Sequence, residues 1–183
     1  MRPAVLLPAV LLAAVSFLEA APAKKAPAPS SAPSASSTPQ AVATAVRWTS
    51  LEQAAKDVAP GKKYLFVSVY TDWCGYCRKL NNVTYKAPKV IAELERNFRS
   101  VRLNAESDAK VTWKGKVYSS AQLAEEWGVE GYPTLLFLNG KGEIVGSFSS
   151  YAEPDLMVKL LTYISSGARE RKLTFEEFVG GKS

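Results

Sequence analysis

The stretch that decides the fold reads YTDWCGYCRKL and runs from Tyr70 to Leu80. An apolar run with many β-prone residues, at 64–70, leads into it, and the residues after Cys74 favour a helix. Cys74 and Cys77 are the only cysteines in the chain. We expect them at the junction of a strand and a helix, which is a typical position for thiol redox chemistry.

Composition limits the kinds of protein that this chain can be. It has 183 residues, of which 47% are hydrophobic and 22% charged, which suits one medium globular domain. Lysines and arginines are scattered, so the net charge of +6 indicates a basic surface rather than a nucleic-acid site. The absence of histidine excludes Ser-His and Cys-His catalysis, histidine metal ligation and covalent haem attachment.

The N-terminal segment has the pattern of a secretory signal. Arg2 precedes an apolar run at 4–18, and small residues follow it. We expect a signal peptide at 1–20, with cleavage after Ala23 as the alternative. An uncleaved anchor fits less well because the run is short for a span of about 20 residues and contains Pro8. We therefore expect a periplasmic or otherwise extracytoplasmic protein without stable membrane insertion, in a compartment where disulfides persist.

Three further segments follow the signal. Residues 21–45 are mainly Ala, Pro, Ser, Thr and Lys, a composition that cannot bury enough apolar surface to offset the entropy of ordering. We expect a disordered linker there. The folded domain is expected at 46–166, and a C-terminal tail with one short helix at 167–183.

Periodicity within the domain predicts helices and strands in alternation. Helices are expected at 51–58, 74–80, 88–98, 119–127 and 154–165, and strands at 63–70, 99–104, 135–138 and 143–148. The near-continuous apolar character of 63–70 indicates a central strand buried on both faces. Asn139-Gly140 predicts a hairpin between the last two strands. Residues 105–118, which include Trp113, are expected to form a hairpin or a long surface loop.

The chemistry of the cysteine motif follows from its place at a helix start. Unpaired N–H groups and the positive end of the helix dipole should lower the pKa of Cys74. Cys74 is therefore the expected nucleophile, and Cys77, one turn later, is expected to resolve the mixed disulfide. Gly75 and Tyr76 should tune the balance between dithiol and disulfide, and Trp73 offers an apolar shoulder beside the sulfur.

Other roles for the cysteines are less consistent with the sequence. A purely structural disulfide would close too small a loop to restrict the unfolded chain much. Zinc or an iron–sulfur cluster would need ligands that one chain lacks, so only a site shared between chains could hold either. We expect no metal and no cofactor beyond the Cys74–Cys77 disulfide. Inert buried thiols are a further alternative, but the flanking Asp72-Trp73 is an unusual environment for them.

The order of these elements, with WCGYC after a buried strand and GYPT before a terminal hairpin, resembles the thioredoxin superfamily over 46–164. The segment DWCGYCRKL is similar to the C-terminal thioredoxin-like domain of the bacterial transmembrane thiol:disulfide interchange reductases and to their small exported relatives. The Gly-Tyr dipeptide is similar to that of periplasmic disulfide isomerases. The resemblance implies an α/β thioredoxin fold, with a central mixed sheet of four or five strands flanked by helices.

The resemblance also implies a substrate-binding loop at Tyr132, Pro133 and Thr134. The peptide bond before Pro133 should be cis, which places the Tyr132 backbone beside Cys74, where an extended substrate segment can pair like an added strand. The alternative from the residues alone is an ordinary trans proline at the start of a strand. Tyr132 then occupies a position that tunes partner choice in the family.

Two residues depart from the family's pattern. Many relatives carry a buried acid six positions before the first cysteine, where this chain has Ser68, and Arg102 falls where a lysine is common. Asp72 and Glu106 are candidates for proton transfer in place of that acid. Surface carboxylates are more often simply solvated, so we assign neither a catalytic role.

Together these features predict an exported thiol:disulfide oxidoreductase that reduces disulfides of exported proteins. We expect a monomer that receives electrons from a membrane protein and binds no nucleic acid. An isomerase or oxidase is the alternative within the same class, although isomerases of this type dimerise through a separate domain that residues before 46 cannot supply. A redox-inactive binding or chaperone module is the alternative from another class.

Overall fold

The computed structural model describes residues 43–58 and 63–181. The expected signal peptide lies outside these residues, as does almost all of the expected linker. Within the described residues, no helix is both long enough and apolar enough to cross a membrane.

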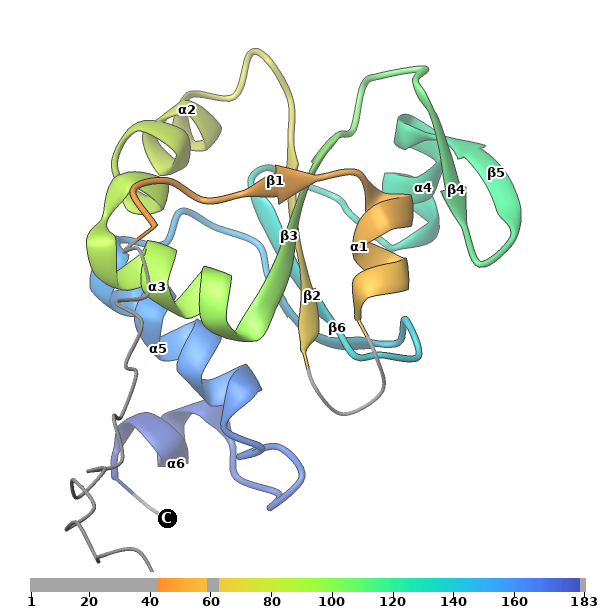
Figure 1. Cartoon of the computed structure of the whole chain (residues 1–183). Helices are drawn as coiled ribbons and strands as arrows, with labels where there is room; N and C mark the ends of the chain where they lie inside the picture. The colour runs from red at the N-terminus through yellow and green to blue at the C-terminus, as the bar shows by residue number, and fades with distance from the viewer. Residues whose placement is uncertain (1–42, 59–62, 182–183) are drawn as a thin grey trace, which may run out of the picture. The chain divides into compact units, whose positions relative to one another are not determined.

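The main sheet has five strands and mixed direction, as expected (Figure 1). Its strands are β1 Trp48–Thr49, β2 Tyr64–Tyr70, β3 Phe98–Asn104, β6 Thr134–Leu138 and β7 Ile144–Phe148. They lie in the order β1-β3-β2-β6-β7, with β1, β3 and β2 parallel and β6 and β7 antiparallel. Strand β2 is thus central, and all of its residues except the first and last are buried. This confirms the prediction of a strand buried on both faces.

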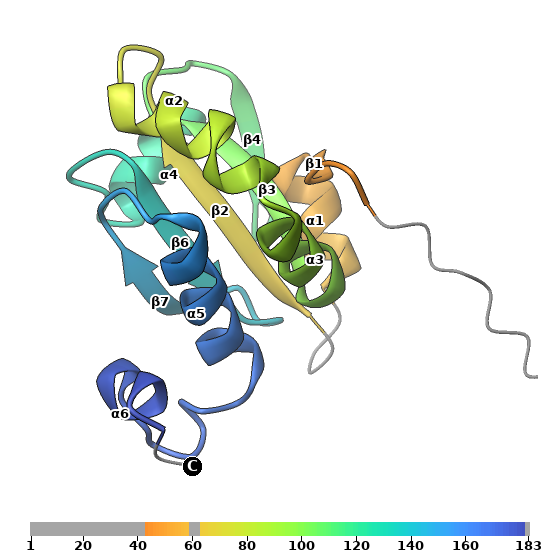
Figure 2. The ribbon, with the colours of Figure 1, turned by 90° about the vertical axis from the view of Figure 1, so that its left-hand side faces the viewer.

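Helices cover both faces of this sheet (Figures 1 and 2). The helices are α1 Leu51–Asp57, α2 Gly75–Asn82, the 3-10 turn η1 Thr84–Lys86, α3 Pro88–Asn97, α4 Ser120–Glu126, α5 Pro154–Ser165 and α6 Phe175–Val179. One hydrophobic cluster joins α3 and α5 to Phe66 and Phe137, and a second joins α1 and α4 to Leu65 and Leu136. The pleat explains this division, because neighbouring residues of one strand point to opposite faces.

Local capping fixes the starts of two predicted helices. The Ser50 hydroxyl accepts the Gln53 N–H at 3.2 Å and begins α1. Ser119 and Gln122 form a reciprocal capping box at the start of α4. The short strand β1 was not predicted, because two residues carry no periodic signal; it is defined by pairing with β3.

The segment 105–118 contains a hairpin of its own, formed by β4 Lys110–Trp113 and β5 Lys116–Ser119. Trp113 is buried and packs edge-on against Trp127, with ring centroids 5.5 Å apart. Gly142 lies against the same indole, where an added Cβ would come within 2.7 Å of the Trp113 Cζ2. The hairpin alternative is therefore confirmed, and its tryptophan extends the core rather than standing free on the surface.

Candidate active site

The two cysteines form a disulfide at the start of α2, directly beyond the end of β2. Cys74 is the N-cap of α2, and its Sγ accepts the Cys77 backbone N–H at 3.1 Å. The Cα atoms are 5.2 Å apart, and the residues are only 3% and 5% exposed. The sulfur of Cys74 thus faces the positive end of the helix, which favours its thiolate when the disulfide is reduced. This is the strand-to-helix junction that the sequence predicted.

Aromatic rings stand on the surface beside the buried sulfurs. Trp73 is 65% exposed and Tyr76 is 63% exposed. The Trp73 Nε1 donates to the Glu106 Oε1 at 2.8 Å, and its ring packs edge-on against Tyr132 with centroids 6.0 Å apart. Glu106 therefore orients an indole, a role that the sequence did not indicate.

A second aromatic pair flanks the motif on the side of α5. Tyr76 stacks on Tyr151, with ring centroids 6.0 Å apart. The Lys79 Nζ lies 4.3 Å from the centre of the Tyr151 ring, within the range of a cation–π interaction. Sequence analysis missed Tyr151, because it lies in a loop after β7 and belongs to no motif.

The loop before β6 reaches the active site through strand pairing. The Tyr132–Pro133 peptide bond is cis. Thr134 pairs with Val69 near the end of β2, and so carries the loop to the residues that precede Cys74. Thr134 itself is buried, and its hydroxyl hydrogen-bonds to the Gly131 carbonyl oxygen at 2.7 Å. Its side chain thus supports the loop from within.

Ser68 has a buried partner that the sequence did not reveal. The Tyr85 hydroxyl, from η1, donates to the Ser68 Oγ on β2 at 2.8 Å, and both residues are buried. Burial raises the pKa of the Tyr85 phenol well above its ordinary value, so the pair is neutral. Arg102 lies beside Ser68 in the register of β3, with its guanidinium 4.3 Å from the centre of the Tyr70 ring.

The surface carboxylate of Asp72 is also held by a neighbour. Its Oδ2 accepts from the Asn104 Nδ2 at 3.1 Å, and its backbone carbonyl accepts from the Arg78 Nη1 at 3.0 Å. These contacts join the turn after β2 to the end of β3 and to α2. These contacts hold the turn that precedes Cys74 in place.

Comparison with known proteins places this arrangement in a family. The model of the thioredoxin-like domain family matches residues 51–165. A protein disulfide isomerase-like 5-2 from Oryza sativa subsp. japonica is 31% identical over 99 residues, which are 54% of this chain and 20% of the relative. A protein disulfide-isomerase from Gallus gallus is 32% identical over 100 residues, which are 54% of this chain and 17% of the relative. The match thus spans about a fifth of the length of these curated relatives.

Solved structures agree on the fold. A thioredoxin-fold protein from Helicobacter pylori aligns with a TM-score of 0.56 at 18% identity and covers 69% of this chain and 88% of its own. A protein from Bacteroides thetaiotaomicron described as a candidate disulphide-isomerase aligns with a TM-score of 0.51 at 32% identity and covers 69% of this chain and 98% of its own. By its matched family model, its five-stranded sheet and its CxxC disulfide, the chain belongs to the thioredoxin-like domain family.

Proposed function

We propose that this protein is an exported thiol:disulfide oxidoreductase that reduces disulfides in other exported proteins. The observation that carries the redox chemistry is the Cys74–Cys77 disulfide at the start of α2. The family and the disulfide isomerases among its relatives support the same class of reaction. Export is supported by the signal-like sequence at 1–20.

The proposed reaction is an exchange of two thiols for one disulfide. In the reduced protein, the Cys74 thiolate attacks one sulfur of the substrate disulfide and releases the other as a thiolate. The Cys77 thiolate then attacks the Cys74 Sγ, which restores the Cys74–Cys77 disulfide and releases the second substrate thiol. Two electrons pass to the substrate. A separate reductant must return two electrons before the next turnover.

The direction of electron flow depends on how strongly the Cys74 thiolate is stabilised. Strongly oxidising pairs owe their high reduction potential to a stabilised reduced form. Here Arg78 donates to the Asp72 carbonyl and Lys79 lies over the Tyr151 ring, so the groups that hold these two cations are not the Cys74 sulfur. The Cys74 Sγ accepts one backbone N–H, from Cys77. This modest stabilisation supports a low potential and therefore a reductase.

The electron donor follows from the proposed location. An exported protein cannot draw directly on cytoplasmic reductants, so we propose a membrane protein that carries electrons outward as the donor. The proposed form is a monomer. An isomerase or oxidase is the second candidate, supported by the disulfide isomerases among the relatives and by Gly75-Tyr76. A redox-inactive binding module is a third candidate.

The reduction potential separates the reductase from the oxidase or isomerase. The full-length protein is equilibrated with glutathione redox buffers, and the fraction of reduced Cys74 and Cys77 is measured by thiol alkylation and mass spectrometry. We expect a value of roughly −270 to −230 mV, near that of thioredoxin. A value near −120 mV would refute the reductase and leave an oxidase or isomerase.

A trapping experiment identifies the substrates and tests the binding-module alternative. In the Cys77→Ser variant, the mixed disulfide on Cys74 cannot be resolved by the partner thiol and should accumulate. Cys74→Ser is the matched control and should trap nothing. If biological function survives in Cys74→Ser, the protein works as a binding module and not as a reductase.

A further inference from the structure

A polar cavity of about 290 Å³ lies beside Cys77, between α2 and the ends of β2 and β3. It is lined by Tyr70, Thr71, Asp72, Cys77, Arg78, Asn81, Asn82 and Arg102. The loop with Pro133 leads into β6, which pairs with the opposite edge of β2. The cavity and the Pro133 loop therefore flank the disulfide on different sides.

Two guanidinium groups in this cavity have no acidic partner. Within residues 43–58 and 63–181, no salt bridge within 4.0 Å involves Arg78 or Arg102. Arg102 is held in place by the Tyr70 ring and by a long contact, at 3.5 Å, from its Nη1 to the Asn81 Oδ1. The carboxylate in the wall, that of Asp72, is already hydrogen-bonded to an asparagine on β3. The cavity is thus preorganised for a negative group.

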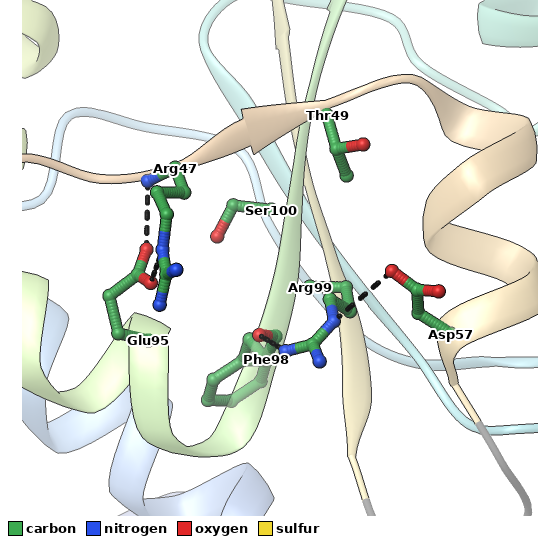
Figure 3. Close-up of a pocket in the computed structure, with 7 residues that line it drawn as sticks. All are labelled: Arg47, Thr49, Asp57, Glu95, Phe98, Arg99 and Ser100. Carbon is green, nitrogen blue, oxygen red and sulfur yellow. Dashed lines mark hydrogen bonds and ion pairs between the residues drawn. The ribbon is translucent and has the colours of Figure 1, made fainter.

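A second cavity provides the contrast (Figure 3). It has about 250 Å³ and lies at the opposite end of β3, around Phe98. There Arg47 reaches Glu95, and Arg99 reaches Asp57 at 3.5 Å. Each arginine of that cavity is matched by a carboxylate of the protein, so the site has no excess charge to offer a ligand. In the cavity beside Cys77, neither arginine is paired with a carboxylate of the described residues.

An unpartnered hydroxyl provides a second indication of a ligand. Thr71 is 1% exposed, and it is the described residue whose buried side-chain oxygen has no hydrogen-bond partner. Buried hydroxyl groups are nearly always hydrogen-bonded, because an unmade bond costs free energy. Thr71 lines the cavity, but its Oγ1 exposes less than 1 Å² of surface, so a molecule bound there supplies the missing bond only after the side chain rotates.

We propose that this cavity binds a carboxylate carried by the molecule that exchanges thiols with the protein. A carboxylate matches the planar fork of arginine and accepts hydrogen bonds from asparagine amides and from a hydroxyl. It arises either from an acidic side chain next to a cysteine of a polypeptide substrate or from a small carboxylated thiol. The proposal rests on the proposed function only for the identity of this molecule. Binding itself needs no electron transfer.

The test uses probes that cannot exchange thiols, on the oxidised full-length protein. One probe is S-methylglutathione, and the other is a hexapeptide with S-methylcysteine flanked by glutamates. A hexapeptide with glutamine in place of glutamate is the neutral control. Binding is followed by the ¹⁵N–¹H shifts of Arg78 and Asn82, and the same spectra report whether each variant is folded.

Arg102→Gln and Arg78→Gln should each weaken binding of the acidic probe roughly tenfold, as expected for loss of one charge-assisted contact. Arg47→Gln removes the same charge from the second cavity and should change the dissociation constant less than about twofold, because screening weakens distant charges. Arg78 and Arg102 are both exposed, so at least one of the two cavity variants is expected to fold.

The outcomes separate the two sources and can overturn the proposal. Arginine-dependent binding of the acidic hexapeptide alone identifies a polypeptide substrate, and such binding of S-methylglutathione alone identifies a small thiol. If both bind, the tighter one identifies the source. The proposal is overturned if neither the glutamate hexapeptide nor S-methylglutathione binds more weakly to Arg78→Gln or Arg102→Gln than to the wild type. Because no electron is transferred, a failed reductase prediction leaves this result unaffected.

Discussion

The neutral pair of Tyr85 on η1 and Ser68 on β2 makes a measurable contribution to stability. Tyr85 and Ser68 are 4% and 3% exposed and share a hydrogen bond of 2.8 Å. Tyr85→Phe removes the donor and leaves the serine hydroxyl buried without this partner, which should cost about 1–2 kcal/mol of unfolding free energy. Ser68→Ala should cost a similar amount, because it leaves the phenol unpaired. The double variant should cost about 1 kcal/mol less than the sum, since neither orphaned group remains.

The burial of Tyr85 predicts that the protein loses stability at high pH. The pKa of Tyr85 is raised in the folded protein by burial, with hydrogen bonding to Ser68 and the charge of Arg102 acting in the opposite direction. The folded state therefore holds the phenolic proton more tightly than the unfolded state. This contribution is fully present below the ordinary tyrosine pKa of about 10. It is lost as the pH rises from there through the folded pKa, with a slope approaching about 1.4 kcal/mol per pH unit.

Urea denaturation at pH 7 and at about pH 10.5 tests both statements. Tyr118→Phe is the control, because its hydroxyl makes no hydrogen bond within the described part of the chain and its ring lies half-buried in the β4–β5 hairpin. Tyr85→Phe should reduce the fall in unfolding free energy between pH 7 and about pH 10.5, whereas Tyr118→Phe should leave this fall as in the wild type. The reasoning would be refuted if the losses in unfolding free energy of Tyr85→Phe and Ser68→Ala simply add in the double variant. It would also be refuted if Tyr85→Phe loses as much stability at about pH 10.5 as the wild type does.

Three further predictions concern the rest of the domain. Gly142→Ala should lower the free energy of unfolding by about 1–3 kcal/mol, because Gly142 has a φ of +70° and the new Cβ would lie 2.7 Å from Trp113. An unchanged midpoint of urea denaturation would contradict the packing of the hairpin. Glu106→Ala should free the Trp73 indole, lowering its fluorescence anisotropy and lowering kcat/KM for disulfide reduction about twofold to fivefold, whereas Glu106→Gln keeps an acceptor and should restore most of both. Cys74→Ser should reduce insulin disulfides no faster than buffer; residual turnover would place the nucleophile elsewhere.

Much of the fold could be predicted because the apolar pattern is strong along β2. The run at 64–70, apolar except for Ser68 and rich in β-prone residues, indicated a buried strand, and Gly140 marked the terminal hairpin. Short elements were less predictable. Strand β1 exists through pairing with β3. The break between the helices predicted at 74–80 and 88–98 is present, but the 3-10 turn η1 that lies within it was not predicted.

The site could be predicted where function depends on local sequence and not where it depends on tertiary contacts. Cys74 and Cys77 are recognisable from spacing and from the strand before them. Tyr85 and Tyr151 are not, because each reaches its partner from a distant part of the chain. A single tyrosine in a polar loop gives no periodic or motif signal. Such contacts become visible only when the sheet order is known.

The order of strands also explains why the two sides of the disulfide differ in chemistry. Because β2 is central, the antiparallel half of the sheet adjoins the motif on one side and the parallel half on the other. The antiparallel half supplies the rings of Tyr132 and Tyr151, which border the exposed aromatic residues of the motif. The parallel half supplies the guanidinium of Arg102 and the cavity next to Cys77. The aromatic side and the charged side of the motif can therefore be altered separately, without moving the two sulfurs.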